Sequence, residues 1–87
     1  MRIIAKGKVY DTNNPKWVIL AEYTKPLDVD IMYKTTTGEY VRYTKVILDT
    51  DTPTPPIEKM ELLEDAKAYD ILSNFRGVVY YDKFEEA

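Results

Sequence analysis

The chain of 87 residues contains no cysteine and no histidine, and Ser73 is its only serine. The lack of cysteine excludes disulfides and thiolate nucleophiles, and the lack of histidine removes the commonest general base and the commonest metal ligand. No Ser-His, Cys-His or zinc-dependent mechanism can therefore be built from this chain alone. Carboxylate chemistry is the only enzymatic route left, and we expect a non-enzymatic protein that needs no cofactor or metal.

Long apolar runs are also missing. The longest extends from Trp17 to Ala21, five residues, far short of the roughly 20 residues that a membrane-spanning helix needs. The start, Met1 to Gly7, holds too few apolar residues for the core of a signal peptide. With 45% hydrophobic and 31% charged residues, we expect residues 1–87 to form a single soluble, intracellular domain.

Charge is unevenly distributed between the two halves of the chain. Residues 1–46 hold eight Lys/Arg and five Asp/Glu, a balance of +3, whereas residues 47–87 hold four Lys/Arg and ten Asp/Glu, a balance of −6. The sum is the net charge of −3. An acidic second half repels a phosphate backbone and attracts a basic surface, so we do not favour direct nucleic-acid binding.

The clearest structural signal is a hairpin over residues 29–47. A three-residue loop of Thr36, Thr37 and Gly38 pairs Tyr33 with Val41 and separates apolar from charged side chains, whereas a slip of one residue would mix them. Gly38 then takes the left-handed position of a bulged turn. One face is expected to carry Val29, Ile31, Tyr33, Val41, Tyr43 and Ile47. The other is expected to carry Asp30, Lys34, Arg42 and Thr44, with Met32 and Tyr40 among them.

Further elements are predicted from shorter patterns. Strands are predicted at residues 3–5, 9–10, 17–24, 57–62 and 78–81. The first two are joined by Lys6-Gly7, which can form a tight turn, although one continuous bent strand fits equally well. The apolar residues on both sides of strand 17–24 suggest a central place in the sheet.

Residues 63–74 are predicted to form a helix. Its expected core stripe is Leu62, Ala66, Tyr69 and Leu72, with residues 83–87 as a frayed tail. The sequence therefore predicts an α+β fold, a small antiparallel sheet of four to five strands with one helix packed on its apolar face.

Three groups of residues suggest chemistry. Asp49 and Asp51 resemble part of a calcium site, but three prolines follow and no calcium-loop glycine does, so we interpret them as a solvated loop. Tyr40 and Arg42 could form a stacking platform for single-stranded nucleic acid or pack across strands. The carboxylates around the helix could act in acid/base catalysis, increase solubility or form an acidic docking face. The candidate partner-binding residues are Glu58, Glu61, Glu64, Asp65, Asp70, Asp82, Glu85, Glu86, Tyr40 and Arg42.

Three segments occur in a recognisable order: Gly7-Lys8-Val9-Tyr10-Asp11-Thr12, then Met32 to Tyr43, then Met60 to Lys67. This order resembles a loose family of small phage- and plasmid-encoded proteins with a Gly-Lys-x-Tyr-Asp-Thr start, a Tyr-Lys-Thr-x-x-Gly hairpin and an acidic helix. The stretch from Phe75 to Tyr81 departs from the acidic, helical tail that is usual there.

The resemblance implies a function, because small mobile-element proteins of this kind are found among anti-defence genes, including anti-CRISPR inhibitors. It implies a host defence nuclease, a CRISPR effector, as the partner and the host cytoplasm as the place of action. The expectation is an inhibitor that blocks nucleic-acid binding or cleavage through its acidic surface. The alternative is a small nucleic-acid-binding or regulatory module that uses its sheet face. Neither the residues nor the resemblance predicts an oligomeric state.

Overall fold

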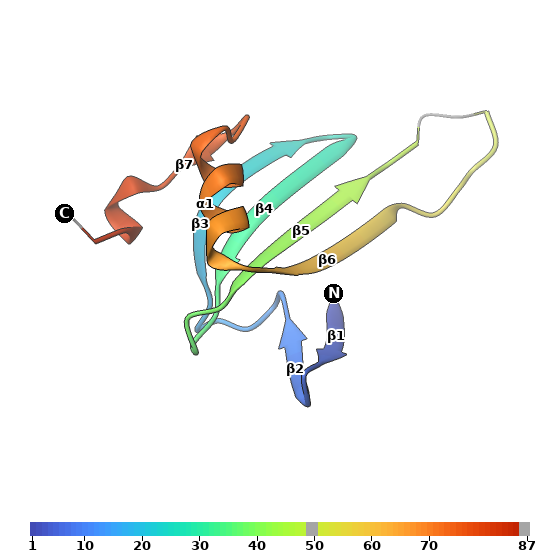
Figure 1. The fold of residues 1–87 in the computed structure, drawn as a ribbon. Coiled ribbons are helices and arrows are strands. Elements are labelled where there is room, and N and C mark those ends of the chain that lie inside the picture. Colours follow the sequence, from blue (N-terminus) through green and yellow to red (C-terminus); the bar gives the residue numbers. More distant parts are fainter. Residues whose placement is uncertain (49–50, 86–87) are drawn as a thin grey trace.

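The computed structural model describes residues 1–48 and 51–85 and contains two sheets (Figure 1). The larger is a five-stranded antiparallel sheet in the order β6-β5-β4-β3-β7, and the smaller is the β1–β2 hairpin. The elements are β1 (Arg2–Ala5), β2 (Lys8–Asp11), β3 (Val18–Lys25), β4 (Asp28–Lys34), β5 (Tyr40–Val46), β6 (Ile57–Leu63), α1 (Asp65–Ser73), β7 (Val78–Val79) and the short 3-10 helix η1 (Tyr81–Lys83). The predicted α+β fold is confirmed.

The β4–β5 hairpin has the predicted register. Tyr33 pairs with Val41, and the Thr35 N–H donates to the Glu39 carbonyl oxygen at 2.9 Å, which closes a three-residue loop. Gly38 has φ +82°, a left-handed conformation that disfavours any residue with a Cβ. Apolar alternation therefore favoured this register, because a slip of one residue would have moved apolar side chains to the wrong face.

The start of the chain is a hairpin rather than one bent strand. Lys6 and Gly7 both have positive φ, 53° and 71°, and Ala5 pairs with Lys8 across the turn. Two consecutive positive φ values define the mirror-image turn whose twist matches that of antiparallel strands. The hairpin can therefore fold back as a separate two-stranded unit.

The two faces of the large sheet are covered by different elements. On the helix face, Met32 and Tyr40 lie in a cluster with Ala68 of α1. On the hairpin face, Tyr33 and Val41 pack with residues of β1 and β2, including Tyr10. The helix therefore covers the face predicted to be mixed, and the more apolar face of β4 and β5 is covered by the N-terminal hairpin (Figure 1).

Strand β3 contains a bulge that supplies the helix face with two neighbouring side chains. Pairing with β4 shifts between Ile19 and Ala21, so that Leu20 and Ala21, at 1% and 0% exposure, both join the helix-side cluster. The prediction that β3 is central in the sheet is confirmed only in part, because its outer neighbour β7 pairs with it only at Ala21 and Glu22.

The predicted stripe of the helix is right only at Leu72, which packs against the helix-side cluster. Ala68 is the buried residue of α1, whereas Ala66 is exposed and Tyr69 is half exposed. The error arose because Leu62 belongs to β6 and α1 begins only at Asp65, so the periodicity was counted from a residue outside the helix. Ile71 and Leu72 complete the packed side.

The end of the chain is more ordered than predicted. Strand β7 has only two residues, and η1 follows it. Phe84 packs against the helix-side cluster, so the prediction of a frayed tail is wrong for that residue, and residues 86–87 lie outside the described part.

Gly77 precedes β7 at a point where a Cβ would lie 2.3 Å from the Glu22 carbonyl oxygen, so no side chain fits there.

Candidate functional site

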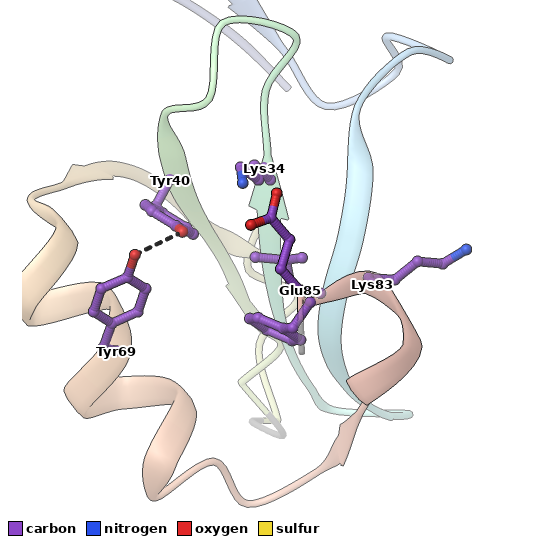
Figure 2. A pocket seen from close by; sticks show the side chains of 7 residues that line it. Lys34, Tyr40, Tyr69, Lys83 and Glu85 are labelled. Carbon is purple, nitrogen blue, oxygen red and sulfur yellow. Dashed lines mark hydrogen bonds between the residues drawn. The ribbon is translucent and has the colours of Figure 1, made fainter. Parts of the chain in front are cut away.

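Tyr40 is a buried link between the sheet and the helix, with 6% of its surface exposed. Its hydroxyl donates to the Tyr69 hydroxyl oxygen at 3.2 Å (Figure 2). The two rings are arranged edge to face, with their centres 5.6 Å apart. That hydrogen bond and burial raise the pKa of Tyr40 to about 12. The idea that Tyr40 forms an exposed stacking platform is therefore wrong.

Arg42 is engaged by a buried carboxylate on the same face. Asp30 is 1% exposed, and Arg42 donates to its two oxygens at 3.0 and 2.7 Å. The paired carboxylate raises the pKa of the Arg42 guanidinium. Arg42 is thus part of a structural ion pair, which was not predicted from the sequence, although Asp30 and Arg42 were placed on one face.

The other two arginines are also paired. Arg76 donates to both Asp28 oxygens at 2.7 and 3.0 Å, and its guanidinium lies 4.2 Å from the centre of the Tyr23 ring. Arg2 pairs with Asp11 at 3.2 Å. Every guanidinium of the chain is therefore bound to a carboxylate of the chain itself, which the sequence pattern did not indicate.

Glu58 and Glu61 lie on opposite faces of the sheet. The Glu58 carboxylate accepts a hydrogen bond of 3.0 Å from the Tyr43 hydroxyl on the hairpin face. Glu61 pairs in register with Arg42 on the helix face and contacts Lys59 at 3.1 Å. Positions three apart along a strand point in opposite directions, so these two residues cannot belong to one acidic face.

Glu64 and Asp65 are brought together with a third carboxylate at the junction of β6 and α1. Both are exposed, and with Glu39 they line a cavity of about 400 Å³. We call it the acidic cleft; its lining residues are Lys6, Gly38, Glu39, Tyr40, Leu62, Leu63, Glu64 and Asp65. Lys6 is its one basic lining residue among the described residues, so the cleft has an excess of negative charge.

Glu39 was missed by the sequence reasoning. Its carboxylate accepts hydrogen bonds from the Tyr10 hydroxyl at 2.7 Å and from the Thr37 hydroxyl at 2.8 Å, and the Lys8 ammonium lies 3.5 Å away. These donors hold the pKa of Glu39 below its ordinary value, so it stays ionised at neutral pH. The position of the Glu39 carboxylate depends on Tyr10, which lies 29 residues earlier in the chain. No local sequence pattern encodes this contact.

The remaining candidate acids lie elsewhere. Asp70 lines a second cavity of about 310 Å³ beside Asp30 and Arg42. Asp82 is exposed in η1 and lies 3.8 Å from the Lys83 ammonium. Glu85 lines a third cavity of about 320 Å³, where Figure 2 shows its carboxylate directed toward the side of Lys34. Glu86 lies outside the described residues.

Within residues 1–48 and 51–85, no group of three or more acidic side chains is placed to hold a metal ion. Asp49 of the Asp-x-Asp pattern lies outside these residues. Over the same residues, no helix combines the length and apolar character needed to span a membrane. No protein-family model, curated protein or solved structure matches the chain.

Proposed function

We propose that this protein is a non-enzymatic inhibitor carried by a mobile element. It binds a CRISPR effector nuclease in the host cytoplasm through the acidic cleft and blocks nucleic-acid binding or cleavage. The observation that carries the proposal is the grouping of Glu39, Glu64 and Asp65 around a cavity of about 400 Å³. The resemblance to small mobile-element proteins supports the choice of partner.

The chemistry of the cleft suits a basic side chain of a protein partner. A lysine or arginine that enters it meets the exposed carboxylates of Glu64 and Asp65, and Leu62 and Leu63 provide an apolar wall for the aliphatic part of that side chain. Surfaces that hold nucleic acid are rich in lysine and arginine because they neutralise phosphates. An acidic protein competes for those same cations and gains association rate from the opposite charge.

The alternative, a nucleic-acid-binding module that uses the sheet face, has less support. It needs free cations and an exposed aromatic ring. Tyr40 is buried, and Arg42 is held by Asp30. Only lysines would remain to contact phosphates.

The experiment mixes the purified protein with guide-loaded CRISPR effector nucleases of several types and measures cleavage of a matched DNA or RNA target. In parallel, direct binding to single- and double-stranded oligonucleotides is measured. We expect stoichiometric inhibition of at least one effector and no oligonucleotide binding at physiological salt. Oligonucleotide binding without inhibition of any effector would favour the alternative.

A further inference from the structure

Strand β6 is a long, open edge of the sheet. It has seven residues, Ile57–Leu63, and pairs with β5 over its whole length without a register shift. The opposite edge is β7, which has two residues. Long regular edge strands template further strand pairing, and natural proteins usually interrupt or cover them. Neither a bulge nor a proline interrupts β6.

The outward-facing backbone groups of β6 can be assigned from the hairpin register. The Thr35–Glu39 pair is hydrogen bonded, and hydrogen-bonded pairs alternate along antiparallel strands. Following the registers from β4 through β5 to β6, Lys59 and Glu61 bond to β5. Glu58, Met60 and Leu62 therefore direct their N–H and C=O groups outward. Among the described residues, no backbone hydrogen bond outside the sheet ladder involves β6.

We propose that β6 pairs with β6 of a second copy of this chain, antiparallel and centred on Met60. In this register the outward groups of Glu58, Met60 and Leu62 bond to Leu62, Met60 and Glu58 of the second copy. Lys59 then lies opposite Glu61 of the second copy, and Glu61 lies opposite its Lys59. Strand β6 is thus complementary to itself in both backbone hydrogen bonding and charge.

The same register covers exposed apolar surface. Ile57 is 56% exposed and Val46, its partner on β5, is 39% exposed. Both lie on the helix face, where β5 ends and β6 begins. Figure 1 shows this end of the two strands extending away from α1. The two-fold axis is perpendicular to the sheet, so Ile57 lies opposite Leu63 of the second copy, next to the start of its helix. The exposed Ile57 side chain of each copy is thereby brought against the other copy.

The test is a concentration series of the whole chain by sedimentation equilibrium, with charge variants at the two facing positions, Lys59 and Glu61. Lys59→Glu places two like-charged pairs across the interface, and so does Glu61→Lys. The dimer dissociation constant of each variant should therefore rise by at least about tenfold. An equimolar mixture of the two variants restores both opposite-charge pairs, because position 59 of each copy then faces a side chain of opposite charge at position 61 of the other. We expect the mixture to form heterodimers with an affinity close to that of the parent chain.

A matched control is Asp82→Lys, which reverses an exposed charge in η1, outside β6, and its dimer should persist. Circular dichroism of each variant checks that the sheet is intact. The proposal is overturned if the parent chain stays monomeric up to about 1 mM, a very weak affinity for a specific dimer. It is equally overturned if the single variants dimerise as well as the parent chain, because the contact would then lie elsewhere.

Discussion

The two faces of the central sheet are held by different kinds of interaction. The helix face contains the buried Asp30–Arg42 ion pair and the hydrogen-bonded Tyr40–Tyr69 pair. The hairpin face is mainly aromatic and apolar, with Trp17 lying 5.6 Å from Tyr33 and 6.3 Å from Tyr10 between ring centres. Both faces contain side-chain hydrogen bonds, since Tyr10 and Tyr43 donate to Glu39 and Glu58 on the hairpin face. The faces therefore differ chiefly in the buried ion pair of the helix face. The carboxylates at the junction of β6 and α1, Glu64 and Asp65, are exposed and belong to neither set of contacts.

The largest expected effect on stability is at Asp30, the buried carboxylate of the helix face. Asp30→Ala leaves the Arg42 guanidinium in place without its buried carboxylate, and we expect a loss of about 3–5 kcal/mol of stability. Chemical denaturation measures the change. The matched variant, Asp30→Leu with Arg42→Met, removes both charges and should retain much of the stability. Equal losses in the two variants would assign the effect to packing volume instead of the unpaired charge.

A second prediction compares a glycine on each side of the molecule. Gly77→Ala places a Cβ 2.3 Å from a backbone oxygen of β3, and we expect a cost of about 1–3 kcal/mol. Gly7 has φ +71° and open space around it, so Gly7→Asn should cost less than about 1 kcal/mol because asparagine tolerates that conformation. Thermal denaturation of both variants checks this order. A Gly77→Ala protein as stable as the parent would show that α1 and β7 are loosely attached.

A third prediction concerns the tyrosine hydroxyls. The pKa of Tyr40 in the folded chain, about 12, lies above the ordinary value of about 10. Its contribution to stability is therefore complete below about pH 10 and is lost as the pH rises through about 12. Tyr69→Phe removes the accepting hydroxyl, so the pKa of Tyr40 should fall toward its ordinary value. Ultraviolet titration of phenolate formation measures it.

The control for that titration is Tyr43 on the hairpin face. Burial, followed by the hydrogen bond to Glu58, raises the pKa of Tyr43 to about 12. Since burial is the larger cause, Glu58→Gln should leave much of this rise in place. If Glu58→Gln lowered the pKa of Tyr43 as much as Tyr69→Phe lowers that of Tyr40, the two faces would not differ in the way described.

The smallest expected effect is at the start of the helix. Glu64 is the N-cap of α1 and makes no side-chain capping hydrogen bond. In Glu64→Ser a capping hydroxyl replaces a favourable charge near the helix dipole, so we expect a change of less than about 0.5 kcal/mol. Thermal denaturation measures it, and a change well above about 1 kcal/mol would indicate that Glu64 maintains the fold rather than serving a partner.

The sequence predicted local features better than their assembly. The β4–β5 register followed from apolar alternation, and Gly38 followed from the turn that this register needs. The side of the sheet covered by α1 did not follow, and Leu62, just before the predicted helix, was wrongly counted in the apolar stripe of that helix. Arg42 and Asp30 were placed on one face, but their burial and pairing were not predicted, since no local pattern shows that a helix covers them.

The sequence likewise predicted part of the candidate site but not how its residues come together. Glu64 and Asp65 precede an apolar helical pattern, so their exposure near the start of the helix could be anticipated. Glu39 could not be found, because it joins them only through the folding of the β4–β5 loop beside β6. The separation of Glu58 from Glu61 was implicit in the predicted strand over residues 57–62, where side chains alternate, but the two were grouped with the helix carboxylates by charge alone.

The most direct test of the account is the association rate between the protein and an effector nuclease that the cleavage assay shows it to inhibit. Glu64→Lys with Asp65→Lys is compared with Asp51→Lys with Asp82→Lys, which makes the same change in net charge at exposed positions outside the cleft. The account predicts that the cleft variant associates about tenfold more slowly or worse and loses its dependence on salt, whereas the control changes about twofold or less. An equal loss in both variants, or no loss in the cleft variant, would contradict binding through the acidic cleft.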